Sequence, residues 1–180
     1  KSSAASDVYK RQLQASLRRT ALKYDRAGDA HYDTISALHK SIRGSDPDAA
    51  LYWLARMVAG GDDPLFIARR LIVCASEDCC SAEMLNLATA TYRACEIVGL
   101  PECGINLSHC VVTLAECPKS TRSYRAWKKA LSKVASDYNY PVPLHIRNAP
   151  TRLMKELGYS AMYRYEPSFA HPVYQEFFPP

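Results

Sequence analysis

The sequence predicts an all-α fold: a multi-helix bundle followed by an irregular tail rich in aromatic residues and proline. Apolar residues recur at helical spacing through most of the chain. Glycines followed by an Asp-Pro pair separate the periodic segments, as expected where one helix ends and the next begins. No credible pair of strands is present. Because 48% of the 180 residues are hydrophobic, they can form one helical domain with a substantial core, alone or with extensions.

Residues 31–57 predict a helical hairpin around which we expect the rest of the chain to pack. Ile35, Leu38 and Ile42 lie at i, i+3 and i+7, which places them on one helical face. We expect Gly44 to end this helix by adopting a positive φ. The apolar face of the second helix is expected to comprise Ala50, Leu51, Leu54, Ala55 and Val58.

An aspartate followed by a proline opens two of the predicted helices. Asp46 and Asp63 have the short acceptor side chain of an N-cap, and Pro47 and Pro64 follow at the first helical position, where a missing N–H costs nothing. These pairs therefore predict the starts of the second hairpin helix and of a third helix.

Three further long helices follow, over residues 81–99, 101–117 and 121–138. The helix over 101–117 has a cysteine at every seventh position, near one stripe of its surface. We interpret these as small buried core residues rather than as a metal site. They are Cys103, Cys110 and Cys117.

The helix over residues 121–138 is strongly amphipathic. Its buried side is expected to comprise Tyr124, Trp127 or Ala130, Leu131 and Val134. Its exposed side is expected to comprise Arg122, Arg125, Lys128, Lys129 and Lys133.

These elements suggest four parts of the chain. Residues 1–12 show no apolar periodicity, and we interpret them as a disordered leader that need not be native to the protein. Residues 13–30 are expected to form a short helix and a polar linker, and residues 31–158 the helical domain. Residues 159–180 are expected to form an irregular tail packed on the surface, with its aromatic side chains anchored in grooves.

Charge and cysteine content narrow the class of protein. The formal net charge is +5, and residues 119–155 hold nine basic residues against the single acid Asp137. Such a segment indicates an acidic partner, most often nucleic acid or an acidic protein tail, or equally a solvated helix face. Seven cysteines without a C-x-x-C pair favour reduced thiols and an intracellular protein. No apolar run approaches the roughly 20 residues of a membrane span, so no membrane partner is expected.

The sequence contains no recognisable catalytic set. A phosphate-binding loop, a G-x-S-x-G elbow and an H-E-x-x-H zinc pair are all missing. His31 and His39 are better interpreted as capping or surface residues, and His109 has no identifiable third partner. Glu77 and Asp78 are adjacent, so we expect them to point in different directions on a helix. A stand-alone enzyme would need a pocket that joins His31, Asp33 or His109 to a second polar group.

Several segments together resemble one protein family. They are residues 31–57 (HYDTISALHKSIRGSDPDAALYWLARM), 63–71 (DPLFIARRL), 75–78 (ASED), 118–120 (PKS) and 142–159 (VPLHIRNAPTRLMKELGY). The chain is similar to the C-terminal half of the RarA/MgsA family of AAA+ ATPases, whose eukaryotic members are the Werner-helicase-interacting proteins. The resemblance covers about residues 17–180, and residues 1–12 match nothing that we recognise in the family.

The resemblance implies a fold and a function that composition alone does not. It implies a helical domain similar to a clamp-loader collar, placed after a lid region that residues 13–30 would continue. It implies homotetramers, and a parent protein that is a DNA-dependent ATPase acting in DNA replication-fork maintenance, recombination and repair. ATP and Mg²⁺ would bind in an N-terminal AAA+ module, with no cofactor or metal in this segment. A single-stranded-DNA-binding protein or a polymerase would be a partner, in the nucleus of a eukaryote or the cytoplasm and nucleoid of a bacterium.

Two functions therefore stand as hypotheses beside the less favoured enzyme. The first is a collar and oligomerisation domain, and the second is a stand-alone nucleic-acid-binding module centred on the basic segment 119–155. Candidate contacts with another module or subunit are His39, Lys40, Arg43, Arg56, Arg69 and Arg70. Candidate nucleic-acid contacts are Lys119, Arg122, Arg125, Lys128, Lys129 and Lys133.

Overall fold

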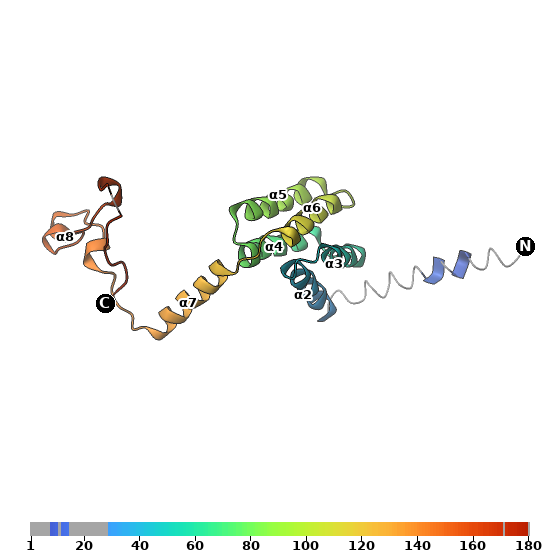
Figure 1. Ribbon diagram of the computed structural model, residues 1–180, viewed down its shortest axis with the longest axis horizontal. Helices are drawn as coiled ribbons and strands as arrows, with labels where there is room; N and C mark the ends of the chain where they lie inside the picture. The colour runs from blue at the N-terminus through green and yellow to red at the C-terminus, as the bar shows by residue number, and fades with distance from the viewer. Residues whose placement is uncertain (1–7, 11, 15–28, 171, 180) are drawn as a thin grey trace, which may run out of the picture. The chain divides into compact units, whose positions relative to one another are not determined.

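A computed structural model describes residues 8–10, 12–14, 29–170 and 172–179, and within these residues every regular element is helical (Figure 1). The predicted all-α fold is therefore confirmed. The predicted leader and linker lie largely outside the described residues, although residues 8–10 and 12–14 are helical. The chain divides into two compact units, residues 1–128 and 129–180, and the division falls inside one helix. The sequence predicts a boundary at residue 158, which lies inside the second unit.

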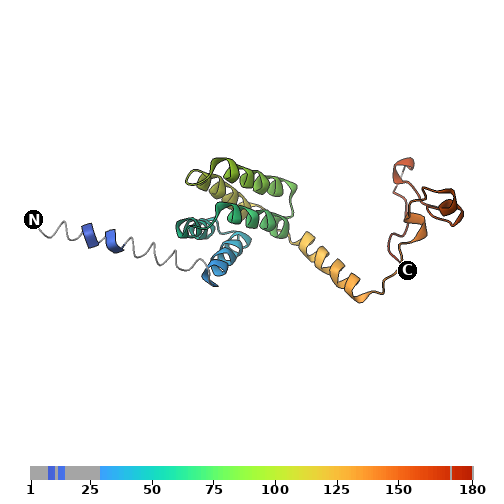
Figure 2. The same ribbon diagram turned by 180° about the vertical axis from the view of Figure 1, so that it is seen from behind.

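Within residues 29–116, which the structure describes without a gap, the first unit has five packed helices (Figures 1 and 2). They are α2 (Asp29–Arg43), α3 (Pro47–Gly60), α4 (Pro64–Cys74), α5 (Ala82–Val98) and α6 (Cys103–Glu116). The predicted hairpin is confirmed, because α2 packs chiefly against α3. The central element, however, is α6, which contacts each of the other four helices. Its fully buried side chains include Leu107, Cys110, Val111 and Leu114.

The predicted N-caps are confirmed. Oδ1 of Asp46 accepts a hydrogen bond from the amide of Ala49 at 2.9 Å, and Oδ1 of Asp63 accepts from the amide of Leu65 at 2.9 Å. Each cap satisfies a backbone donor that a helix start leaves unpaired, which is why these two residues define where α3 and α4 begin.

The prediction that Gly44 adopts a positive φ is wrong, because Ser45 takes the left-handed conformation, at φ 58°. The amide of Gly44 still donates to the carbonyl of Lys40 at 2.8 Å, so it continues the helix. The amide of Asp46 then reaches back to the carbonyl of Ser41 at 3.0 Å, which closes the helix end.

Helix α4 continues into one turn of π-helix, η2 (Ala75–Cys79). Its wider turn buries both Asp78 and Cys79, and the chain then reverses at Cys80, which has φ 48°. Single π-turns of this kind occur frequently at functional sites. Cys103 and Cys110 are buried, as expected, whereas Cys117 is only partly buried and its Sγ lies 2.9 Å from Sγ of Cys79.

The expectation that helix α7 (Arg122–Ser136) buries an apolar side is wrong, because none of its residues is buried. Trp127 is 63% exposed and Val134 is 76% exposed. A helical pattern identifies an apolar face but not the surface that covers it.

The second unit is built mainly from turns, around η3 (Leu144–Ile146), α8 (Arg152–Glu156) and η4 (Glu166–Ser168). The predicted tail belongs to it, since the amide of Ser160 donates to the carbonyl of Leu144 at 2.9 Å. The guanidinium of Arg147 also lies 5.3 Å from the centre of the Tyr159 ring. The tail is irregular, as expected, but its aromatic side chains other than the half-buried Tyr159 are exposed within the unit. Its placement on the surface of the bundle stays a prediction.

Candidate functional site

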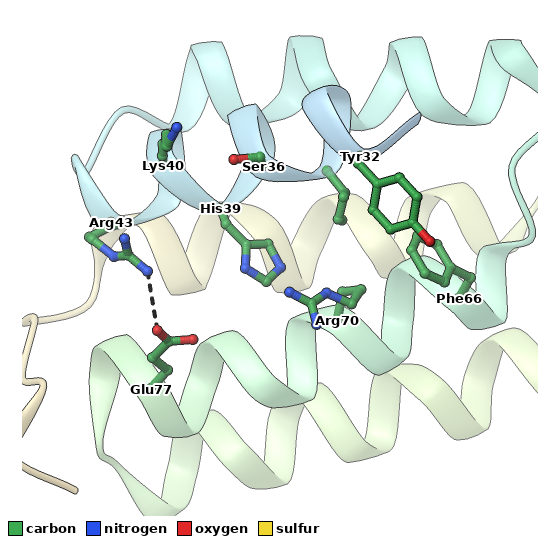
Figure 3. A pocket seen from close by; sticks show the side chains of 9 residues that line it. Tyr32, Ser36, His39, Lys40, Arg43, Phe66, Arg70 and Glu77 are labelled. Atoms are coloured by element: carbon green, nitrogen blue, oxygen red, sulfur yellow. Dashed lines mark ion pairs between the residues drawn. The ribbon is translucent and has the colours of Figure 1, made fainter. Parts of the chain in front are cut away.

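Helices α2 and α4 enclose a cavity of about 410 Å³ in the first unit (Figure 3). Its lining includes four of the six candidate contact residues, His39, Lys40, Arg43 and Arg70. In Figure 3, His39 and Arg70 point toward each other in the middle of the cavity. Arg43 and Glu77 lie at one end of it, and Tyr32 and Phe66 lie at the other.

His39 is a buried residue, not the surface residue that the sequence suggested. It is 7% exposed, and its Nε2 has no hydrogen-bond partner among the described residues. Burial, and after it the charge of the neighbouring Arg70, lower the pKa of His39 from its ordinary 6.5 to about 4. The imidazole is therefore neutral at physiological pH and keeps one ring N–H to donate.

Arg43 is held by two carboxylates from η2. Its Nε donates to Oδ1 of Asp78 at 2.7 Å, and its Nη2 lies 3.5 Å from Oε1 of Glu77. The expectation that Glu77 and Asp78 diverge is therefore wrong, because the π-turn lets both reach one guanidinium. The pairing raises the pKa of Arg43 above its ordinary value. Arg43 thus supports the fold, a role that the sequence did not reveal.

The other two candidate contact residues lie outside the cavity. Arg56 places its guanidinium 5.5 Å from the centre of the Trp53 ring, and Arg69 lies 3.5 Å from a carboxylate oxygen of Asp63. Both side chains are exposed. Tyr32 and Phe66 also line the cavity, although the sequence gave no signal for them beyond their aromatic character.

The basic residues proposed to contact nucleic acid do not form one uniform group. Lys119 closes the end of α6, because its Nζ donates to the carbonyls of Ala115 and Cys117 at 2.8 and 2.7 Å. Lys128 lies 4.9 Å from the centre of the Tyr124 ring. The remaining four lie along α7: Arg122, Arg125, Lys129 and Lys133.

The apolar side of α7 begins beside a second cavity of the first unit, of about 440 Å³. Tyr124 and Trp127 of α7 line it together with Ile72 and Val73 of α4. Large exposed apolar side chains that gather in this way mark interaction surfaces in soluble proteins. We call the exposed apolar residues Tyr124, Trp127, Leu131 and Val134 the α7 stripe.

Comparison with known proteins identifies the family. Residues 44–180 match the family described as MgsA AAA+ ATPase C terminal, and residues 1–43 match the one described as AAA C-terminal domain. The chain belongs to the MgsA C-terminal family. The second match includes residues 1–12, for which the sequence alone predicts no resemblance to the family.

Named relatives of this MgsA-family chain occur in bacteria and in a eukaryote. It is 46% identical over 162 residues to replication-associated recombination protein A of Escherichia coli (strain K12), covering 88% of this chain and 36% of that protein. It is 45% identical over 162 residues to ATPase WRNIP1 of Dictyostelium discoideum, covering 89% of this chain and 18% of that protein. It therefore spans about a third or less of the length of these relatives.

His31 of this MgsA-family domain pairs with a carboxylate. Nδ1 of His31 lies 2.8 Å from Oδ1 of Asp62, which ties the start of α2 to the turn after α3. Asp33 and His109 are both exposed.

Among the described residues, no group of three or more His, Cys, Asp or Glu side chains could hold a metal ion, and no helix is long and apolar enough to cross a membrane.

One thiol of the domain stands apart from the others. Sγ of Cys80 lies 2.7 Å from Oγ of Ser123, and Nε of Arg122 donates to it at 3.1 Å. These hydrogen bonds, the one with Ser123 first, lower the pKa of Cys80, whereas burial raises the pKa of Cys110 to about 11. The sequence showed the Cys79-Cys80 doublet but not this difference.

Proposed function

We propose that this chain is the oligomerisation domain of a replication-associated recombination AAA+ ATPase, and that it assembles as a homotetramer. Membership of the MgsA C-terminal family and the names of its relatives support the assignment to a replication-associated recombination AAA+ ATPase. In the parent protein, ATP and Mg²⁺ would bind in an AAA+ module, and DNA at replication forks would be the substrate in recombination and repair. A single-stranded-DNA-binding protein or a polymerase would be a further partner.

The observation that carries the oligomer is the α7 stripe. Its residues lie at i, i+3, i+7 and i+10, which places them on one side of a helix with 3.6 residues per turn. The tyrosine and the tryptophan in its N-terminal half are residue types that contribute most to protein interfaces. Water contact with this face is unfavourable, so a second copy of α7 or an apolar face of another copy would stabilise the domain.

A specific observation also favours nucleic-acid binding as a second function. Arg122, Arg125, Lys129 and Lys133 follow i, i+3, i+7 and i+11, on the side of α7 opposite to the stripe. Only Lys133 of these forms an ion pair with a carboxylate among the described residues, with Asp137 at 2.8 Å. The two functions use opposite faces of one helix, so one molecule can perform both.

Light scattering coupled to size-exclusion chromatography tests the oligomer. We expect the 180-residue chain to have a mass near four times its monomer mass of 20.1 kDa at tens of micromolar. The double variant Trp127→Ala with Leu131→Ala should lower that mass, because it removes two stripe residues. The matched control, Arg125→Gln with Lys129→Gln, changes the opposite face and should leave the mass unchanged. A monomeric parent chain would overturn the proposal.

Salt-dependent binding to single-stranded DNA tests the second function. Reversing charge with Arg125→Glu and Lys129→Glu should weaken binding at low salt and reduce its salt dependence, because fewer counterions are released from the phosphates. The double variant Trp127→Ala with Leu131→Ala serves as the control. Its binding to single-stranded DNA is compared with that of the parent chain at the same protein concentration, together with the oligomeric state of each. Absence of binding by the parent chain at low salt would rule out this function for the chain.

A further inference from the structure

The cavity between α2 and α4 carries more positive charge than its own carboxylates offset. Lys40, Arg43 and Arg70 line it with one acid, Glu77. Arg43 is occupied by Asp78 and Glu77, whereas neither Lys40 nor Arg70 forms an ion pair within the described part of the chain. Its volume of about 410 Å³ lies within the range of small-molecule sites. The cavity therefore suits an anionic ligand of small-molecule size.

A buried polar atom points to the same ligand. Nε2 of His39 is enclosed in the cavity wall and has no hydrogen-bond partner in the described residues. Buried polar groups are nearly always paired in folded proteins, so an unpaired one needs a ligand or a water. A neutral imidazole protonated at Nε2 can donate to an oxyanion that also contacts Arg70, the side chain it faces in Figure 3.

Aromatic rings occupy the end of the cavity away from the Arg43–Glu77 ion pair (Figure 3). The ring of Tyr32 is exposed, and the half-buried ring of Phe66 contacts the ring of His31, whose centre lies 4.7 Å away. Exposed aromatic rings beside cations bind single nucleotides well, because a base can stack on a ring while its phosphate contacts the cations.

We propose that this cavity binds a phosphorylated nucleotide, with the phosphate at Arg70, Lys40 and His39 and the base against Tyr32 and Phe66. This site is separate from the basic face of α7 and does not depend on the oligomer. A free nucleotide and a nucleotide unit of single-stranded nucleic acid share this chemistry. A protein carboxylate would satisfy the cations but would leave both rings without a partner.

The imidazole resonances of the ¹⁵N-labelled chain report binding directly. The His39 signals are assigned by their loss in His39→Gln and are followed at pH 7 and constant ionic strength. Thymidine 5′-monophosphate is expected to shift them in a saturable way, and inorganic phosphate to bind at least about fivefold more weakly, because it has no base to stack. If hexathymidylate binds at least tenfold more tightly than the mononucleotide, the ligand of the cavity is a nucleotide unit of single-stranded nucleic acid. If the two affinities are similar, the ligand is a free nucleotide.

Two adjacent arginines of α4 provide the matched control. Arg70→Gln should weaken binding of the mononucleotide at least fivefold, while Arg69→Gln, which changes an arginine outside the cavity, should leave it unchanged. If Arg70→Gln does not fold, Lys40→Gln on the exposed rim of α2 takes its place with the same expected loss. The proposal is overturned if no nucleotide shifts the His39 signals, if hexaglutamate binds as tightly, or if both arginine variants lose affinity equally.

Discussion

Arg43 and Asp78 form an ion pair whose two members differ in exposure. Nε of Arg43 donates to Oδ1 of Asp78 at 2.7 Å, but the arginine side chain is 47% exposed and that of the aspartate is 1% exposed. Asp78 also accepts a weaker hydrogen bond from the thiol of Cys74, at 3.6 Å. The pair joins the end of α2 to η2, so it fixes the cavity wall that carries His39 and Glu77.

The difference in exposure predicts an asymmetric effect of mutation. Arg43→Ala would leave a buried carboxylate with only a thiol donor, and should lower the free energy of unfolding by about 3 kcal/mol. Asp78→Asn leaves an exposed arginine and an amide oxygen that can still accept, so it should cost about 1 kcal/mol. Urea denaturation at pH 7 measures both values.

The exposed pair of Arg69 and Asp63 supplies the control for this measurement. Its two side chains are 53% and 55% exposed and lie 3.5 Å apart, so Arg69→Ala should change stability by no more than about 0.5 kcal/mol. A cost for Arg43→Ala no larger than that of Arg69→Ala would contradict the structural role assigned to Arg43.

Stability should fall in mild acid because of His39. Its pKa is about 4 in the folded chain against 6.5 when unfolded, so the unfolded state binds the proton first as pH falls. The contribution of neutral His39 to the free energy of unfolding is about 3 kcal/mol; it is fully present above pH 6.5 and is lost as the pH falls through 4. The charges of Arg70 and Arg43 oppose protonation, whereas Asp78 and a hydrogen bond with the backbone of Arg70 favour it.

Urea denaturation between pH 7.5 and 4 measures this loss. His39→Gln should remove most of the extra decline over that range, whereas His109→Gln, at an exposed position of α6, should leave it. If the wild-type chain and His39→Gln lose stability in parallel, the imidazole does not titrate as the structure indicates.

The parts that the sequence predicted are those that depend on neighbouring residues. Asp46 and Asp63 each cap a helix through an amide two or three positions away, so short-range patterns identify them. The face of α2 was equally readable from its spacing. The prediction of a positive φ at Gly44 is wrong because the adjacent Ser45 adopts the left-handed conformation instead.

The parts that the sequence could not predict depend on contacts between distant segments. Arg43 and Asp78 are 35 residues apart, and their pairing requires a π-turn that no simple motif announces. The cavity exists only because α2 and α4 lie side by side. The sequence therefore indicates its four candidate residues one by one but not that they share a cavity. The apolar periodicity of α7 was recognised correctly, but periodicity does not identify the covering partner.

Helix α6 should be the most sensitive element to truncation of its side chains. Leu107 is fully buried at the centre of the bundle, so Leu107→Ala should lower the free energy of unfolding by about 2–5 kcal/mol, through lost burial and the cavity left behind. Ile105→Ala, at a 76% exposed position of the same helix, should change it by no more than about 0.5 kcal/mol. Equal effects in thermal or urea denaturation would contradict the central position of α6.

Cys80 should be the thiol that alkylating reagents modify first. It is partly exposed, and its pKa is lowered by Ser123 and Arg122, so a larger fraction is the nucleophilic thiolate at pH 7 than for an ordinary cysteine. Burial raises the pKa of Cys74 and of Cys110, which should react only when the chain opens.

Timed labelling with iodoacetamide, read by peptide mass spectrometry, measures the order of modification. Ser123→Ala and Arg122→Gln should each slow labelling of Cys80 severalfold, because each removes a hydrogen bond that stabilises the thiolate. Lys129→Gln removes a positive charge from α7 without touching Cys80, and should leave the rate unchanged. Labelling of Cys110 before Cys80, or equal slowing by all three variants, would show that general exposure of the chain decides reactivity and not the two hydrogen bonds.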